Sequence, residues 1–422
     1  MNMHATPQRT QAETALVEAF AARLSELPGD GAVMVKRDDA IEAIKDGLPT
    51  RRVEAWHYTD LRRLLTSVPD HDPTANPKPL VPVIEGSEVL SLLNGVVRGK
   101  APALDGVTFQ NLSDKLTDGS FAQALDPLDA DDAIGFLNTA FVSDGWFVDI
   151  APGAKIEAPI ELQNLQAGGQ THVRLPVRVG AGARATIVER QAGSGAALAS
   201  SVSNLSVGDG ADVVWLIVQE QPETATHLAQ FNAELGKDSR LTLFVMNAGG
   251  KLVRQEIRVK VAGAGADFQL RGVNLLAGDG HTDVTMVLDH AAANTGSREL
   301  VRNVVTGKAR GVFQGRINVH QLAQKTDAKM ACNTLLLSDD AEFSTKPELE
   351  IFADDVQCGH GATVTEIDRS HLFYLMARGI DEKTARGLLV KAFVASVIEE
   401  LDNEALVDAL EAKLDTWFAE HG

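Results

Sequence analysis

The stretch Gly180-Ala-Gly-Ala-Arg-Ala-Thr-Ile-Val188 decides the fold, because its pattern returns at a fixed interval along the chain. The same order of a glycine turn and an apolar strand recurs at Gly208-Asp-Gly-Ala-Asp-Val-Val-Trp-Leu216. Further copies begin at Gly153, Gly236 and Gly263, so that the interval between copies is nearly constant. A fixed period of roughly 28 residues, with strands and turns in each repeat, indicates a repeat architecture. We therefore expect a β-solenoid, in which stacked coils cover one another's apolar faces.

A β-sandwich is the structural alternative for this region. It would show strands about every 8–12 residues without the longer register, so the register favours the solenoid. Glycine at the corners fits a solenoid, because sharp bends need backbone angles that other residues avoid. The period loosens after Gly263, and strand-like runs resume from residue 304 to 352.

The residues on either side of the repeat are predicted to be mainly helical. Leu16, Phe20 and Leu24 form one apolar stripe at helical spacing. Residues 67–88 contain five prolines, which is typical of a linker. The predicted domains are an N-terminal mainly helical domain with the proline-rich linker (1–145), a β-helix core (146–366) and a C-terminal helical domain (367–422).

Composition excludes several classes of function. The chain has 422 residues and a net charge of −19, which disfavours binding to the phosphate backbone of nucleic acids. Two cysteines cannot build a disulfide framework and suggest a reducing compartment. We see no signal peptide, and no run approaches the ~20 apolar residues of a membrane span. A cytoplasmic protein without a membrane partner is expected.

Cys358 and His360 form the most distinctive pair of side chains. At positions i and i+2 of a strand they point the same way, and both are soft coordinating groups. Cys332 precedes His360 by one repeat interval, so an intact register would stack these two side chains about 4.8 Å apart on adjacent coils. A structural zinc site normally needs four ligands, and three are available here. The alternative is a buried cysteine and a hydrogen-bonded histidine that close the end of a sheet.

Other chemistry has little support in the sequence. There is no Gly-x-x-x-x-Gly-Lys-Ser/Thr loop for nucleotide hydrolysis and no Gly-x-Ser-x-Gly elbow. A β-helix enzyme acting on polysaccharide would need clustered carboxylates in a groove. The available carboxylates are those of Asp327, Asp339, Asp340, Glu342, Asp354 and Asp355. Acidic residues in turns, however, are usually just solvated. This enzyme and a purely structural homo-oligomer remain the alternative functions.

Five strings occur in an order that resembles the SufB/SufD family of iron–sulfur cluster assembly proteins: 321–327, 335–339, 345–351, 354–364 and 372–380. The resemblance runs from about residue 146 to 400. Leu48-Pro-Thr-Arg51 and Trp56-His-Tyr-Thr59 are similar to an N-terminal signature of the SufD members. SufB has an acidic residue after the histidine, where this chain has Gly361.

The resemblance implies a right-handed parallel β-helix between helical domains and a non-catalytic scaffold role. It implies pairing with SufB through the β-helix and docking of the SufC ATPase through the C-terminal helices. Sulfur would arrive indirectly from a cysteine desulfurase system. The cluster would be transient and shared with SufB, with none bound tightly by this chain alone. A homodimer in isolation is compatible with this assignment.

The resemblance also assigns roles to particular residues. Cys358 and His360 match the family's Cys-x-His string, which lies at the SufB interface and supports cluster assembly. They are therefore the candidate metal ligands, together with ligands from SufB. Cys332 stands where SufB has a functional cysteine, and its role is tentative. In the tail, one apolar stripe is longer than a simple cap needs, and we predict that it docks SufC: Leu388, Leu389, Phe393 and Val397.

Overall fold

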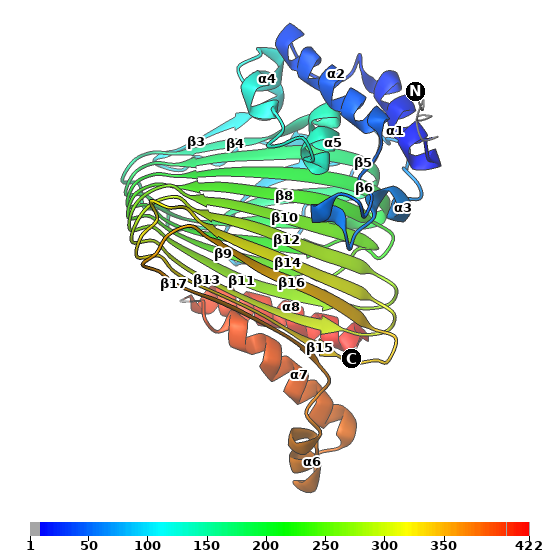
Figure 1. Cartoon of the computed structure of the whole chain (residues 1–422). Helices are drawn as coiled ribbons and strands as arrows, with labels where there is room; N and C mark the ends of the chain where they lie inside the picture. The colour runs from blue at the N-terminus through cyan, green and yellow to red at the C-terminus, as the bar shows by residue number, and fades with distance from the viewer. Residues whose placement is uncertain (1–8, 402, 422) are drawn as a thin grey trace, which may run out of the picture.

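The computed structural model describes residues 9–401 and 403–421. Strands make up 42% of it, and its core is a parallel β-solenoid of about 8 turns flanked by helices at both ends (Figure 1). The prediction of a mainly β, parallel β-helix fold is thus confirmed.

Two sheets form the walls of the β-helix. The long strands β5 (Ile160–Val179) and β6 (Arg184–Val207) each run through both walls. Odd-numbered strands then stack to form the sheet called here the odd sheet: β7 (Asp212–Glu220), β9 (Arg240–Asn247), β11 (Asp267–Leu276), β13 (Gly296–Val305), β15 (Asp327–Leu336) and β17 (Gln357–Thr365). Even-numbered strands form the even sheet: β8 (Thr226–Leu235), β10 (Leu252–Val261), β12 (His281–His290), β14 (Arg310–Val319) and β16 (Glu342–Ile351).

The period of the coils lengthens along the chain. Early in the β-helix, the stacked pair Asn164 and Gln191 is separated by 27 residues. Further on, Asn274 stacks on Asn303 at a separation of 29 residues. In the next coil, Asn303 pairs with Thr334 at a separation of 31 residues. The loosening of the sequence period late in the repeat therefore reflects longer turns and not an end to the stacking.

Four of the five repeated glycines serve close packing, whereas the first, Gly153, has a positive φ and open space where a Cβ would lie. At Gly208 an added Cβ would lie 2.6 Å from the backbone nitrogen of Ala181, and at Gly263 it would lie 2.1 Å from the carbonyl carbon of Gly236. Contacts this short are forbidden to any side chain, so stacked corners require glycine. Gly182 and Gly210, two residues into their turns, do have positive φ.

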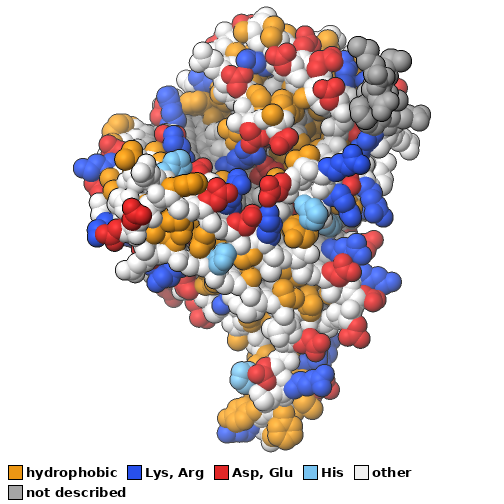
Figure 2. Space-filling model, viewed as in Figure 1, with side chains coloured by type: hydrophobic (Ala, Val, Ile, Leu, Met, Phe, Trp, Pro, Cys, Tyr) orange, Lys and Arg blue, Asp and Glu red, His pale blue; other side chains and the backbone are white. Residues whose placement is uncertain are grey.

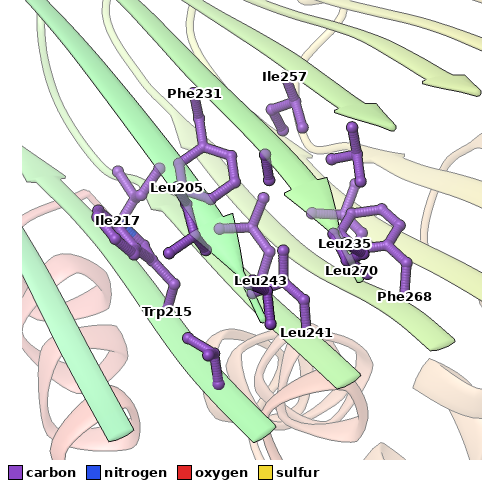
Figure 3. Close-up of a cluster of buried hydrophobic side chains, with 14 of the residues drawn as sticks. Leu205, Trp215, Ile217, Phe231, Leu235, Leu241, Leu243, Ile257, Phe268 and Leu270 are labelled. Carbon is purple, nitrogen blue, oxygen red and sulfur yellow. The ribbon is translucent and has the colours of Figure 1, made fainter. Parts of the chain in front are cut away.

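The lumen between the sheets holds the main core. Trp215, Phe231, Leu243 and Phe268 lie together there and are fully buried (Figure 3). Beside them, amide side chains stack from coil to coil at one position of the odd sheet: Asn164, Gln191, Gln219, Asn247, Asn274 and Asn303. Several bond to the next in line, as Asn274 Nδ2 does to Asn303 Oδ1 at 2.7 Å. These bonds satisfy some of the polar groups within the core, although Asn164 Oδ1 and Asn247 Oδ1 have no hydrogen-bond partner in the described structure.

The N-terminal helices cover the even sheet. They contribute Leu16, Phe20 and Phe141 to a cluster that packs on Leu198 and Leu228 of β6 and β8. The cover comprises α1 (Gln11–Arg23), α2 (Gly31–Asp46), the 3₁₀ turn η1 (Glu54–Trp56), α3 (Leu61–Leu64), α4 (Leu112–Thr117), η2 (Ala122–Leu125) and α5 (Ala133–Phe141). Four strands among these helices extend the walls at the first coil: β1 (Glu88–Leu93), β2 (Val96–Arg98), β3 (Val107–Asn111) and β4 (Asp144–Ile150).

The proline-rich linker is attached to the β-helix rather than free. The backbone of Leu80 exchanges two hydrogen bonds with the side chain of Gln163 on β5, at 3.0 and 2.9 Å. The backbone nitrogen of Val83 donates to Glu161 Oε2 at 2.6 Å. Side chains of β5 therefore supply the partners that an extended, proline-rich segment cannot provide for itself.

The C-terminal helices cover the odd sheet. Val394 of α7 (Glu382–Ile398) and Leu410 of α8 (Glu404–His421) are fully buried in a cluster with Leu216, Phe244 and Val273. The preceding helix α6 (Arg369–Ala377) has no buried residue and projects from the end of the molecule (Figures 1 and 2). Asp368 caps α6 and Asp381 caps α7, each through its carboxylate.

Candidate functional site

The last coil of the β-helix is open. Among the described strands, β16 pairs only with β14, and β17 pairs only with β15. One edge of each strand therefore presents backbone N–H and C=O groups without a ladder partner. Side chains of β17 are mostly exposed, in contrast to the buried positions of the strands before it. We call this end of the solenoid, β16 and β17, the mouth.

Both residues of the Cys-x-His pair lie on β17 at the mouth. Cys358 pairs with Ala328 and His360 with Met330 in the register between β17 and β15. The Cys358 side chain is half-buried against the lumen core, whereas His360 is exposed. Burial is the main cause that raises the pKa of the Cys358 thiol. The free thiol is therefore largely protonated at neutral pH and would lose its proton on binding a metal.

Cys332 lies deeper and does not stack on His360 as the repeat interval predicted. The coil is longer here than in the early repeats, so Cys332 pairs with Ala362, and its expected contact with His360 is wrong by two positions. A shift of two keeps both side chains on the same face of the strand. Cys332 is 1% exposed, and Asn303 Nδ2 donates to its Sγ at 3.3 Å. Burial raises its pKa to about 11, so it is a thiol without thiolate reactivity.

Glu299 on β13 is a buried carboxyl near the mouth that the sequence analysis did not single out. It is 1% exposed, and neither carboxyl oxygen has a hydrogen-bond partner in the described structure. It pairs with Met330, which pairs in turn with His360. Burial raises its pKa to about 8, so the folded protein holds this carboxyl neutral. Buried and partly exposed positions alternate along β13, and Glu299 occupies a buried position between Ser297 and Val301. This alternation is the sequence signal that could have identified Glu299.

These side chains do not converge on one metal ion. Within residues 9–401 and 403–421, no group of three or more His, Cys, Asp or Glu side chains could hold a metal. The mouth thus offers Cys358 and His360 as a partial set, and any further ligands would come from another chain. Both cysteines are free.

The stripe predicted to dock a partner is only partly accessible. Leu388 is 48% exposed, Leu389 and Phe393 are half-buried, and Val397 is fully buried in the contact between α7 and the odd sheet. Leu389 and Phe393 line a groove of about 750 Å³ between α7 and the end of β17. Arg302 lies over the Phe393 ring at 5.1 Å.

Helix α6 exposes a larger apolar surface than the predicted stripe. Phe373 is 73% exposed, Tyr374 56% and Met376 41%. Phe373 and Met376 also line a second groove, of about 730 Å³, next to the corner of the last coils. Figure 2 shows hydrophobic side chains at the tip of this projection. Sequence alone does not distinguish this exposed helix from a core helix, because an exposed and a buried apolar stripe look alike in sequence.

The family model for the SufBD core domain of the SUF iron–sulfur cluster assembly system matches residues 162–393. The chain belongs to the SufBD family. It is 28% identical to the iron–sulfur cluster assembly protein SufD of Escherichia coli over 403 residues, covering 88% of this chain and 90% of that protein. It is 27% identical to the chloroplastic protein ABCI7 of Arabidopsis thaliana over 422 residues, covering 93% and 88%.

A further SufBD family protein, from Synechocystis, is 30% identical over 295 residues, which cover 65% of this chain and 63% of that protein. The resemblance read from the sequence is thereby confirmed, and so is a role in iron–sulfur cluster assembly. The SufBD relatives are named as assembly proteins and not by a reaction. In the described part of this SufBD chain, no helix has the length and apolar character needed to cross a membrane.

Proposed function

We propose that this chain is a non-catalytic scaffold subunit that pairs with SufB through the mouth of the β-helix and docks the SufC ATPase through its C-terminal helices. The open edge formed by β16 and β17 carries this proposal. An unpaired edge is a template for strand addition, because a partner strand can complete the ladder. A second β-helix with an open end of its own is a partner that can satisfy both strands at once.

The residues of the edge are consistent with a specific partner. Lys346, Glu348 and Glu350 place charges along β16, and Pro347 interrupts its row of donors. Charged residues and proline on an edge strand discourage indiscriminate pairing between sheets. A partner must therefore match the pattern of this edge in charge and register. The same edge would also allow a second copy of this chain to pair in isolation, which is the homo-oligomeric alternative.

Cluster chemistry at the mouth would be shared between two chains. Thiolate and imidazole are both accepted as ligands by iron–sulfur clusters. This chain contributes Cys358 and His360, so a transient cluster would take its other ligands from SufB. Sulfur from a cysteine desulfurase system would reach the cluster through the assembled complex. The two free cysteines fit a reducing, cytoplasmic location.

SufC docking is supported by the surface of α6 and the grooves beside α7. Phe373, Tyr374 and Met376 form an exposed apolar patch on a helix without buried residues. Exposed patches of large apolar side chains mark sites of protein association. Leu388, Leu389 and Phe393 extend this surface along α7, whereas Val397 stabilises the attachment of α7 to the β-helix.

Pairing through the mouth can be tested by placing bulk on β17. A Cβ added at Gly361 would meet no atom within 4 Å, so Gly361→Arg should leave the fold intact while obstructing a partner strand. The control is Gly31→Arg on α2, where space is also open. Co-purification from cells that also produce SufB and SufC should recover both partners with the control and lose SufB with Gly361→Arg. Recovery of SufB with both variants would contradict pairing at the mouth.

The ligand role is tested by Cys358→Ser and His360→Ala. Each variant should assemble with the partners, yet the complex should contain less iron and acid-labile sulfide than the wild type. A His360→Ala complex with full cluster content would end the ligand hypothesis for that residue. If subunit pairing is lost before cluster content falls, the two residues have a structural role.

A further inference from the structure

The N-terminal signature, residues 48–59, has no part in the function proposed above. Its central portion, residues 51–58, crosses the outer face of the even sheet as a short irregular segment between α2 and α3. We call this portion the arginine segment, after Arg51 and Arg52. Its position next to the mouth and its exposed charges suggest a role in binding a partner.

Buried side chains fix the arginine segment to the β-helix. The ring of Trp56 is 1% exposed and packs on the guanidinium of Arg254, which lies 3.9 Å from the ring centroid. Just beyond the segment, the hydroxyl of Thr59 lies 2.9 Å from His281 Nε2 and donates to the carboxylate of Asp283. These anchors attach the segment to β10 and β12.

Two more contacts carry the segment toward the mouth. The carbonyl oxygen of Ala55 accepts hydrogen bonds from Arg254 Nη2 at 2.9 Å and from Gln314 Nε2, on β14, at 3.0 Å. Glu54 forms an ion pair with Lys346 Nζ at 2.9 Å, and Lys346 lies on the edge strand β16. The arginine segment and Thr59 therefore contact four strands of the even sheet, and the segment reaches the open edge at Glu54.

Between its anchors the segment exposes cationic and aromatic groups. The side chains of Arg51 and Arg52 are exposed and make no ion pair or hydrogen bond with any described residue. His57 Nδ1 lies 3.3 Å from the carbonyl oxygen of Arg51, and the His57 ring meets Tyr58 edge-to-face at 4.9 Å. Figure 2 shows Lys and Arg side chains gathering on this flank of the molecule. Unpaired arginines are noteworthy in a chain whose net charge is −19.

We propose that Arg51, Arg52, His57 and Tyr58 form a docking surface for an acidic segment of the protein chain that pairs with the β16 edge. This inference rests on the proposed pairing at the mouth. Guanidinium groups bind carboxylates in two-point contacts, and aromatic side chains and arginine are enriched at protein interfaces. The buried anchors hold the backbone in place before binding, which reduces the ordering cost of association. The overall negative charge of the chain favours an acidic protein segment over a nucleic acid.

The test compares two double variants that remove the same charge. Arg51→Ala/Arg52→Ala removes the docking surface, and Arg184→Ala/Arg240→Ala removes two exposed arginines paired with Asp212 and Asp267 elsewhere. Binding of each protein to purified SufB–SufC is measured by surface plasmon resonance at about 50 mM and about 300 mM salt. Circular dichroism and the melting temperature check that both variants fold as the wild type does.

We expect the first variant to bind about tenfold more weakly at low salt, mainly through a slower association rate, and the difference to shrink at high salt. The control should bind like the wild type. Equal affinity of the two variants would overturn the inference. The inference would also be overturned if Arg51→Ala/Arg52→Ala weakened binding to a single-stranded oligonucleotide probe but left binding to SufB–SufC unchanged. If Gly361→Arg blocks binding while Arg51→Ala/Arg52→Ala does not, pairing through the mouth is supported and only the inference about the arginine segment fails. If the wild-type protein does not bind SufB–SufC at all, both proposals are overturned.

Discussion

Replacing Glu299 with glutamine should make the protein less sensitive to alkaline pH. Burial raises the pKa of Glu299 to about 8 from its ordinary value of 4.5. Each unit of pKa corresponds to about 1.4 kcal/mol, so the full shift corresponds to about 5 kcal/mol. Because the folded-state pKa is the higher one, the protonated carboxyl stabilises the fold fully below pH 4.5, and this stability is lost as the pH rises through about 8.

The magnitude follows from this linkage. Between about pH 5 and pH 8, the wild-type free energy of unfolding should fall by about 3 kcal/mol through this group alone. Glutamine has nearly the same shape and does not ionise, so Glu299→Gln should lack this fall. Buried histidines such as His227, whose pKa burial lowers to about 3, act in both proteins and cancel in the comparison.

Urea denaturation of both proteins across this pH range, followed by tryptophan fluorescence, measures the effect. The variant should match the wild type near pH 5 and exceed its stability near pH 8. Glu234→Gln, at an exposed ion pair with Lys260, serves as the control and should leave the wild-type pH dependence unchanged. Parallel denaturation midpoints for wild type and Glu299→Gln across the range would refute the reasoning.

Three shorter predictions concern other regions. Cys358 should react with iodoacetamide well before Cys332, as followed by mass spectrometry, because only Cys358 is partly exposed. Faster labelling of Cys332 would contradict its burial in the lumen. Trp56→Ala should cost about 3–5 kcal/mol of stability, since it opens a cavity over the buried Arg254; an unchanged denaturation midpoint would show that the anchor is dispensable. Phe373→Ala should alter stability by less than about 0.5 kcal/mol and yet weaken SufC capture. Undiminished capture would place the SufC contact elsewhere.

The β-helix was predictable because its information is local and repeated. At Gly180, Gly208 and Gly236, each coil places a glycine where the corner of the preceding coil lies too close for a Cβ. The spacing between these residues therefore measures the coil directly. This measure fails where turns grow, because an extra residue in a turn changes the period without changing the strands. The predicted contact between Cys332 and His360 failed for this reason.

Burial within the candidate surfaces was less predictable. Helix α7 has apolar residues on more than one side, so sequence alone could not tell that Val397 faces the odd sheet while Leu388 faces solvent. Glu299 reads as an ordinary surface glutamate among Arg298 and Leu300, and only the alternation of β13 places it inside. Trp56 was recognised as part of a signature, but its partner Arg254 lies in a distant part of the chain, beyond any local pattern.

The attachment of α7 and α8 to the odd sheet has a consequence for biosynthesis. These helices follow the β-helix along the chain, and they cover apolar residues on β7, β9 and β11. Domains generally fold from the N-terminus during synthesis, so these coils would stack first and expose Leu216 and Phe244 to solvent until α7 and α8 have been synthesised. Over that interval a chaperone that binds apolar strands would find a temporary site, which docking of α7 and α8 would remove.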